Sequence, residues 1–428
     1  MPRPASTAAN STWNYNDPET FQNQVSRDGS TLFFVSPEAG DPRELYVRRN
    51  GHSTLVSHAA DGSAASSGVV PVGTANTVTS AGSYAYGSVD GKAAIFWSVD
   101  SLAPGAPADS MAKAYRYDVE TDTVTYLPGI GGRINVGRLV KASIVAASDD
   151  DRRFLFTEDV GGTFFEGIYV WDEGTIKTIY SGLIRHLAPA RATASGSAFV
   201  FSTSTFDQFL GFNSGPPFTN QIYRYDVAKE KLSCVSCPPD DVVPSGNAIL
   251  SNQDASNAGV ANPTGSVAPS RGFSEDGNHV FFDTPDPLVP RDTNGTRDVY
   301  EWTPTRISLI SSGHDSQPSF FLDSSADGSD VFFATKEGLD ADDADGSYDV
   351  YDAHVDGGFL RREVTPCSGE ECRSSASVPA GAQTAASKSF AGAGNQPQQK
   401  PKKKTHKKKH HKKKAHKRNA GHNRGGSK

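Results

Sequence analysis

The sequence predicts an all-β fold made of small repeated sheets. Its 428 residues include 41 Gly, 26 Pro and 23 Phe but only two Met, and no long segment has helical apolar periodicity. This pattern favours short strands joined by turns. No segment has 18 consecutive apolar residues, so the sequence predicts no helical membrane span. The third observation is a motif that recurs six times along the chain.

The recurring motif begins with a turn of the form Ser-x-Asp-Gly. Asp-Gly supplies a positive φ at low energetic cost, so it is typical of tight hairpin turns. Two copies depart from this form: Ser148–Asp151 has Asp in place of Gly, and Thr193–Gly196 has Thr and Ser in place of Ser and Asp. The four full copies are Ser26–Gly29, Ser88–Gly91, Ser274–Gly277 and Ser325–Gly328.

Each turn leads into a short apolar run that ends in Phe. Because these runs lack polar alternation, they predict strands that are buried on both faces. The runs are Leu32–Phe34, Ala94–Phe96, Phe154–Phe156, Phe199–Phe201, Val280–Phe282 and Val331–Phe333.

A strand that bears Tyr follows 12 to 22 residues after the Phe of each run. Segments such as Ile222–Tyr225 alternate apolar and polar residues, so we expect one face of this strand to be packed and the other to be wet. A third apolar run closes most modules. The tyrosines are Tyr46, Tyr115, Tyr169, Tyr223, Tyr300 and Tyr351.

Six such modules predict a β-propeller. A small sheet of this kind cannot bury its faces alone and needs neighbours stacked against it. Successive Phe positions lie 62, 60, 45, 81 and 51 residues apart, which is too irregular for a tight solenoid and suits propeller blades with variable loops. We expect a six-bladed β-propeller in which residues 13–25 supply a closing strand. A chain truncated at its start would allow seven blades.

The fifth module carries a family resemblance. Its sequence, "SEDGNHVFFDTPDPLVPRDTNGTRDVYEWTPTRISLIS", resembles the WD40-like repeat of TolB-like β-propellers, which also occurs in many secreted bacterial proteins of unassigned role. The resemblance spans roughly residues 20–365 and is best in residues 272–313 and 322–358. It implies a non-catalytic propeller that binds partners on its loop faces or in its central channel.

Composition divides the chain into four parts. We expect a disordered N-terminus (residues 1–12), the propeller (13–365), a flexible linker of small and polar residues (366–399) and a disordered tail rich in Lys and His (400–428). The N-terminus has no apolar segment of the secretory type. An extracellular or cell-surface location, with an upstream signal lost, and a cytoplasmic one therefore both stay open.

The tail has a charge opposite to that of the body. Residues 400–428 contain 14 Lys and Arg, five His and no acid, which leaves 28 basic against 49 acidic residues in the rest, a balance of −21. Lysine runs bind polyanions by counterion release, and without aromatic residues they offer no base stacking. We expect them to bind an anionic polymer or lipid surface, or nucleic acid if the protein is not exported; a purely solubilising tail is the alternative. The lysines are Lys402, Lys403, Lys404, Lys407, Lys408, Lys409, Lys412, Lys413 and Lys414.

The four cysteines form two close pairs, Cys234 with Cys237 and Cys367 with Cys372. An even number of Cys in close pairs on a loop-rich β protein favours local disulfides and an oxidising compartment. A zinc site would need both pairs brought together tetrahedrally. A redox motif would need a thioredoxin-like βαβ context, which the sequence lacks.

Two loops share the pattern Asp-x-Asp/Asn-Gly-x-x-Asp, at residues 292–298 and 343–349. Their carboxylates could gather oxygens for Ca²⁺, although neither loop has the twelve-residue form with a terminal Glu. The alternative is a turn in which Asp and Asn cap their own backbone. Apart from this calcium hypothesis, we expect no cofactor.

No catalytic motif is evident in the sequence. It contains no G-x-S-x-G elbow, no H-E-x-x-H and no P-loop, and its spacing pairs none of the isolated histidines. We therefore expect a monomeric, non-catalytic scaffold that binds a protein partner on one face of the propeller. A propeller enzyme, a hydrolase or lyase with an axial active site, is the alternative, because fold alone does not fix function. These histidines include His52, His58, His186, His279 and His314.

Overall fold

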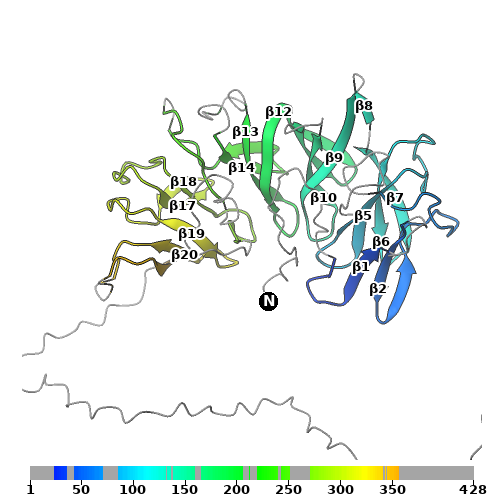
Figure 1. Cartoon of the computed structure of the whole chain (residues 1–428), viewed down its shortest axis with the longest axis horizontal. Coiled ribbons are helices and arrows are strands. Elements are labelled where there is room, and N and C mark those ends of the chain that lie inside the picture. The colour runs from blue at the N-terminus through cyan, green and yellow to red at the C-terminus, as the bar shows by residue number, and fades with distance from the viewer. Residues whose placement is uncertain are drawn as a thin grey trace, which may run out of the picture. The chain divides into compact units, whose positions relative to one another are not determined.

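All regular elements within the described residues are β-strands, as the composition predicts. A computed structural model describes residues 24–355, apart from 36–42, 71–84, 132, 136–137, 160–164, 206–211, 213–218, 240–241, 251–269, 341–342 and 344. Within these residues no helix is long and apolar enough to cross a membrane. Figure 1 shows the sheets following one another in chain order, from blue β1 to yellow β20. The predicted linker and tail lie outside the described residues.

Each of the six predicted modules contains a buried strand paired with a Tyr-bearing strand. The buried strands are β1 (Thr31–Val35), β5 (Ala93–Ser98), β10 (Arg153–Asp159), β13 (Ala198–Thr205), β16 (Val280–Thr284) and β20 (Asp330–Thr335). The Tyr-bearing strands are β2 (Leu45–Arg49), β6 (Lys113–Asp118), β11 (Phe165–Asp172), β14 (Gln221–Asp226), β17 (Asp298–Thr303) and β21 (Asp349–His354).

Further strands flank these pairs. On the side of the Tyr-bearing strand lie β3 (His52–Leu55), β7 (Thr123–Gly131), β15 (Lys231–Cys234) and β18 (Arg306–Leu309). On the other side lie β4 (Ala85–Gly87), β9 (Arg138–Ala147), to which β8 (Arg133–Asn135) is paired, and β19 (Phe320–Ser324).

Modules three and four are joined by one long strand, β12 (Thr175–Ala192), which pairs with β11 and then with β13. They therefore form one eight-stranded sheet instead of two separate small ones. Register shifts along β12 between Ile184 and His186, and between Leu187 and Ala190, mark β-bulges, which let a strand bend from one partner to the next.

One aromatic pair recurs in all six modules. The Phe that ends each apolar run lies directly across the strand pair from the Tyr of the same module, as Phe282 does from Tyr300. Their ring centroids are 5.2–5.9 Å apart in every module. Cross-strand aromatic pairs stabilise a sheet beyond their buried area. The six pairs give each module the same register.

The modules stack by sending alternate residues of the buried strand in opposite directions. In the fifth module, Val280 and Phe282 pack with Val200 of the fourth module, whereas Phe281 packs with Val331 and Phe333 of the sixth. The residues in the position of Phe281 are at most 1 % exposed in the first five modules: Phe33, Ile95, Leu155, Val200 and Phe281.

The first and last described modules each leave one of these faces uncovered. Phe332, in the position of Phe281, is 36 % exposed, and Val350 of β21 is 61 % exposed where its counterpart Val299 is 0 % exposed. At the other end, Leu32 is 36 % exposed, whereas its counterpart Val280 is buried. The two uncovered faces are the complementary halves of the interface that recurs between the other modules. Closure into a six-bladed ring stays a prediction.

The Tyr-bearing strands differ from the expectation of one wet face. Arg224, which alternates with the tyrosines of β14, is only 7 % exposed, and Lys113 at the start of β6 is only 3 % exposed. The prediction was wrong because modules stack on both faces of each sheet, so a polar residue there must find partners inside the protein. Lys113 does so by donating to the carbonyls of Val99, Asp109 and Met111 at 2.6–2.8 Å.

Replacing Phe281 and Phe332 separately by Ala tests the stacking. We expect Phe281→Ala to lower the free energy of unfolding by about 3–5 kcal/mol, because it opens a cavity between two modules. Phe332→Ala should cost only about 1 kcal/mol, since part of its side chain already contacts solvent. Urea denaturation measures both losses. Equal losses would mean that the sixth module is covered as the fifth is.

Candidate functional site

The turns that begin the modules share one hydrogen-bonding pattern. In the fifth module, Ser274 Oγ donates to Asp276 Oδ1 at 2.5 Å, and the same carboxylate oxygen accepts from the Asn278 amide at 3.0 Å. Ser274 Oγ also accepts from the His279 amide at 3.1 Å. The Ser274 and Asp276 side chains thus accept hydrogen bonds from the backbone amides of their own turn. The bond from Ser to Asp recurs at 2.6–2.8 Å in the turns of Ser26, Ser88, Ser148 and Ser325.

The fourth residue of every turn has a left-handed backbone conformation. Its amide donates to the carbonyl of the first turn residue at 2.9–3.2 Å in all six copies. Five of these residues are Gly with φ between 66° and 78°, and Asp151 takes φ 55° in the third turn. Modules three and four therefore keep the turn although their sequences depart from the motif.

Neighbouring turns lie side by side and form a continuous row, here named the turn row. The Arg27 amide donates to the Val89 carbonyl at 2.8 Å, the Asp149 amide to Ala194 at 2.8 Å, and the Glu275 amide to Ala326 at 2.8 Å. A Cβ atom on Gly277 would lie only 2.7 Å from Thr193 Cγ2 of the preceding turn. Glycine is thus required there both by its φ and by the closeness of the next module.

The turn row holds a depression lined by four carboxylates between its fifth and sixth turns. Glu275, Asp276, Asp327 and Asp330 line it with Ser325, Ala326 and Ser329, and no basic side chain takes part. These acids come from two modules, and stacking brings them together.

The aspartates of this acidic depression are held in their charged form. The Ser325 hydroxyl, with the amide and hydroxyl of Ser329, lowers the pKa of Asp327 to about 2. Burial alone would raise the pKa of Asp276, but the bonds from Ser274 and Asn278 outweigh it and lower the pKa. Because hydrogen bonds to a carboxylate favour its charged form, the depression stays negative at neutral pH.

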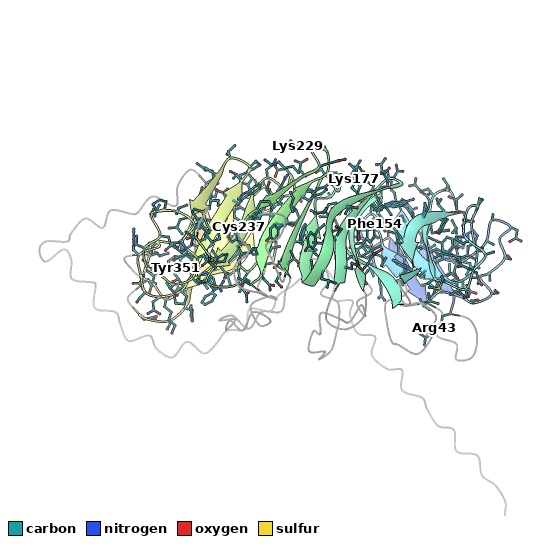
Figure 2. The ribbon with its side chains drawn as sticks, turned by 90° about the horizontal axis from the view of Figure 1, so that it is seen from above. Arg43, Phe154, Lys177, Lys229, Cys237 and Tyr351 are labelled. Atoms are coloured by element: carbon teal, nitrogen blue, oxygen red, sulfur yellow. A yellow bond between two sulfur atoms is a disulfide. The ribbon has the colours of Figure 1, made fainter. Side chains whose placement is uncertain are left out.

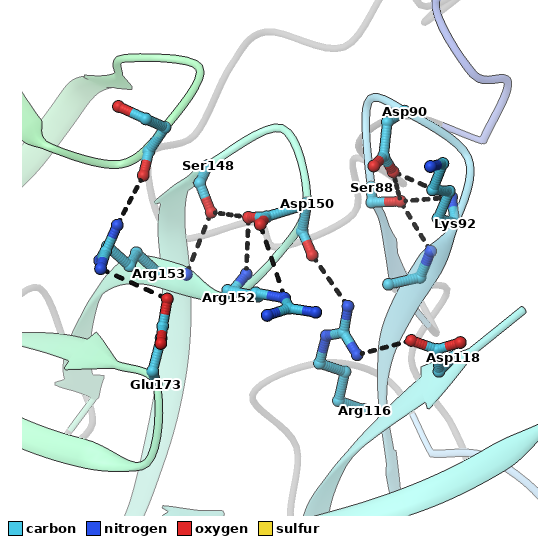
Figure 3. A network of polar contacts seen from close by, with 12 residues as sticks. Ser88, Asp90, Lys92, Arg116, Asp118, Ser148, Asp150, Arg152, Arg153 and Glu173 are labelled. Carbon is cyan, nitrogen blue, oxygen red and sulfur yellow. Dashed lines mark hydrogen bonds and ion pairs between the residues drawn. The ribbon is translucent and has the colours of Figure 1, made fainter. Parts of the chain in front are cut away.

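Two arginines link the Tyr-bearing strands to the next turn, a feature not expected from the sequence. Arg116 donates to the Asp150 carbonyl at 3.1 Å and pairs with Asp118 at 3.4 Å (Figure 3). Arg224 donates to the Gly277 carbonyl at 2.5 Å and pairs with Asp226 at 3.4 Å. The identical segments Tyr-Arg-Tyr-Asp around both arginines are the signal that could have revealed this shared role.

Asp151 is an exception within the turn row. Its side chain is 0 % exposed, and neither carboxylate oxygen has a hydrogen-bond partner among the described residues. Burial raises the pKa of Asp151 well above its ordinary value; Arg116 opposes the shift, and Asp90, Asp150 and Asp149 add to it. A buried acid of this kind is most stable when it is protonated.

The structure covers only part of the residues predicted from the sequence to form sites. Cys234 and Cys237 are joined by a disulfide with their Cα atoms 5.6 Å apart, at the end of β15 (Figure 2). Cys367, Cys372 and the tail lysines Lys402–Lys414 lie outside the described residues. The Asp/Asn-Gly loops immediately precede β17 and β21, as expected.

Comparison with known proteins finds similarity only among solved structures. No protein-family model and no curated protein matches the sequence. The similar structures are TolB and other β-propeller proteins. TolB from Acinetobacter baumannii is 16% identical with a TM-score of 0.29, over 67% of this chain and 52% of TolB. The chain thus spans about half the length of TolB.

Two further propeller structures are similar to the chain at the same level. The propeller domain of the Trilobed protease from Pyrococcus furiosus is 12% identical, covers 78% of this chain and 80% of its own, and has a TM-score of 0.31. An oligogalacturonate lyase in complex with manganese is 12% identical, covers 75% and 72%, and has a TM-score of 0.37. Because these values are low, the function must be argued from the residues of this chain.

Asp151→Asn should change how stability depends on pH. Because the folded-state pKa of Asp151 is raised, the wild type loses stability as pH rises from about 4, the unfolded value, through the folded value. The variant does not titrate there, so we expect it to gain roughly 1 kcal/mol or more on the wild type between pH 4 and 7. Urea unfolding at pH 4, 5.5 and 7 measures this difference.

The control for Asp151→Asn is Asp28→Asn in the first turn. Hydrogen bonds from Ser26 and Ser30 lower the pKa of Asp28 to about 2. Its contribution is complete above the unfolded pKa of 3.8, so the difference between this variant and wild type should be constant from pH 5 to 7. A pH dependence in Asp28→Asn that matched the one in Asp151→Asn would contradict the assignment.

Proposed function

We propose that this protein is a non-catalytic binding scaffold of the β-propeller type. Its acidic depression binds a Lys- or Arg-rich segment of a protein partner. The observation that carries this proposal is the set of four carboxylates, Glu275, Asp276, Asp327 and Asp330, gathered from two modules in a depression that no Lys or Arg lines. A negative surface of this kind accelerates the approach of a cationic partner and disfavours anionic ones.

The rigidity of the turns supports a binding role. Asp276 and Asp327 each accept bonds from a Ser hydroxyl and a backbone amide of their own turn. The Glu275 amide ties the fifth turn to the sixth. A partner therefore meets carboxylates whose positions are already fixed, which reduces the ordering cost of binding.

An enzymatic role is supported less well by the described residues. A propeller hydrolase or lyase would need acid, base or nucleophile groups that converge from several modules. The His354–Asp330 pair, at 2.6 Å, instead joins residues directly opposite one another on β21 and β20. The buried Asp283 pairs with Arg297 at 2.5 Å inside the fifth module. Asp283 also accepts from the Phe321 amide of the sixth module at 2.9 Å, so both pairs have a structural role.

We propose that the tail, residues 400–428, attaches the protein to an anionic surface polymer. The support is its 14 basic residues without one acid, on a body with a balance of −21. A chain with this charge distribution can bind a cationic partner and a polyanion through separate parts. The Cys234–Cys237 disulfide supports action in an oxidising compartment outside the cytosol.

The acidic depression is tested by titrating the full chain with octalysine in a calorimeter at 20 and 300 mM salt. We expect weak binding that salt suppresses, because solvent-exposed charges are screened. The double variant Glu275→Gln/Asp327→Asn should bind roughly three- to tenfold more weakly at low salt, since it removes two exposed charges that each contribute little.

The matched control for the double variant is Asp61→Asn. Asp61 caps a similar turn, accepting from the Ser63 amide at 2.9 Å, but it lies in another loop of the first module. This variant should bind octalysine as the wild type does. An equal loss in both variants would show that only net charge matters and would remove the proposed site.

The tail is tested by retention on an anionic polymer across a salt series, with and without residues 400–428. We expect deletion to abolish retention at low salt, because the remaining body is acidic. For the full chain, the retention should fall steeply as salt rises. Unchanged retention after deletion would reject this role of the tail.

A further inference from the structure

The Asp/Asn-Gly loops of modules five and six have the same internal bonding. In the fifth module, the Tyr300 hydroxyl donates to Asp292 Oδ2, and Asn294 Oδ1 accepts from the Thr296 amide at 2.9 Å. In the sixth, the Tyr351 hydroxyl donates to Asp343 Oδ2, and Asp345 Oδ1 accepts from the Ser347 amide at 2.7 Å. Because the two loops share this bonding, the arrangement of carboxylates in one loop indicates the arrangement in the other.

In the fifth module, this loop buries two carboxylates that are only partly satisfied. Asp292 is 6 % exposed and Asp298 1 %. The Tyr300 hydroxyl binds Asp292 Oδ2, and the Ser311 hydroxyl binds Asp298 Oδ1 at 2.5 Å. Asp292 Oδ1 and Asp298 Oδ2 are buried and complete no hydrogen bond with a described residue, although the Asn294 side chain and the Gly313 backbone lie close to the Asp298 carboxyl.

The two carboxyl groups are close enough to affect each other. Asp292 is near enough to act electrostatically on the buried Asp298 carboxyl. The one cation in the loop, Arg297, points elsewhere: it pairs with Asp283 at 2.5 Å and donates to the Asn247 carbonyl at 3.0 Å. Buried carboxylates with free oxygens are costly unless a cation or another donor meets them.

The sixth module shows how the same pattern arranges its oxygens. One carboxylate oxygen from each of Asp343, Asp345 and Asp349 lies within 4.8 Å of the other two. Oxygens bound to one Ca²⁺ at about 2.3–2.6 Å are at most about 5 Å apart, so this spacing fits a single ion. Oxygen-only ligands suit Ca²⁺ better than zinc, and the irregular loop suits it better than Mg²⁺, which demands near-ideal octahedral geometry.

We propose that the loop Asp292–Asp298 is a Ca²⁺ site in which Asp292 Oδ1 and Asp298 Oδ2 are ligands. The loop Asp343–Asp349 is a second, weaker copy of this site. The ion neutralises the two buried carboxylates and ties the start of β17 to the loop before it. The inference is independent of the proposed function, since it concerns the stability of modules five and six and not the turn row.

The experiment measures thermal unfolding of the full chain after chelation, with 10 mM Ca²⁺ or Mg²⁺ added. We expect Ca²⁺ to raise the unfolding midpoint by about 2–5 °C, as for a site with a Kd of about 0.1–1 mM, and Mg²⁺ to have a much smaller effect. Asp298→Asn should lose most of the Ca²⁺ shift. Absence of a shift in the wild type, or an equal shift with Mg²⁺, would overturn the proposal.

Asp151→Asn is the matched control, because Asp151 is equally buried and has both oxygens unpartnered but lies outside either loop. It should keep the full Ca²⁺ shift; loss of the shift in this variant as well would count against the site.

Terbium luminescence tests the site without measuring stability, so the proposal can still be tested if a variant fails to fold. Tb³⁺ bound in the fifth-module loop would accept energy from Tyr300, whose hydroxyl bonds Asp292. We expect Tb³⁺ emission on tyrosine excitation that Ca²⁺ displaces and that Asp345→Asn, a change at an exposed residue of the weaker loop, reduces only in part. Emission that Ca²⁺ does not displace would reject the assignment.

Discussion

The structure depends on the fact that each small sheet has two apolar faces and can bury neither of them alone. The buried strand meets this constraint with residues that alternate in direction: Val280 and Phe282 pack towards the preceding module and Phe281 towards the following one. Every interface between modules therefore uses the same two half-surfaces. The stability of one module is consequently a property of its neighbours as much as of its own sequence.

Stacking also decides where polar groups can lie. A Ser-x-Asp-Gly turn satisfies its own amides and leaves one edge of the loop backbone for the next turn, so the backbones of neighbouring turns can bond directly, as Glu275 does to Ala326. Where a charged residue falls between sheets, as Arg224 does, it reaches the following turn and stacks 5.9 Å from the ring centre of Trp302. The same packing that buries Phe281 gathers the acids of two turns into one depression. The repeated modules thus determine where these acidic side chains gather on the surface.

Local sequence predicts the parts of the fold that are set by local chemistry. The turns, the buried runs and the tyrosines can be recognised because Phe and Tyr recur at fixed places in every module and Asp-Gly recurs in four of the six. The β12 strand was not predictable, since Thr175–Ala192 contains Gly182 and Pro189, which are typical of a break between strands. The burial of Arg224, Asp292 and Asp298 was not predictable either, because it depends on contacts between segments far apart in sequence. The acidic depression follows from this same non-local packing.

The continuity of β12 makes modules three and four one mechanical element. Elsewhere a connecting loop lets a module separate from its neighbour once the apolar interface between them opens. Here one continuous strand spans the junction, paired with β11 over Thr175–Ile184 and with β13 over Ile184–Ala192, so no loop separates the two modules. Under tension applied along the chain, the middle of the molecule would yield in a single long extension, after the terminal modules had peeled away one at a time.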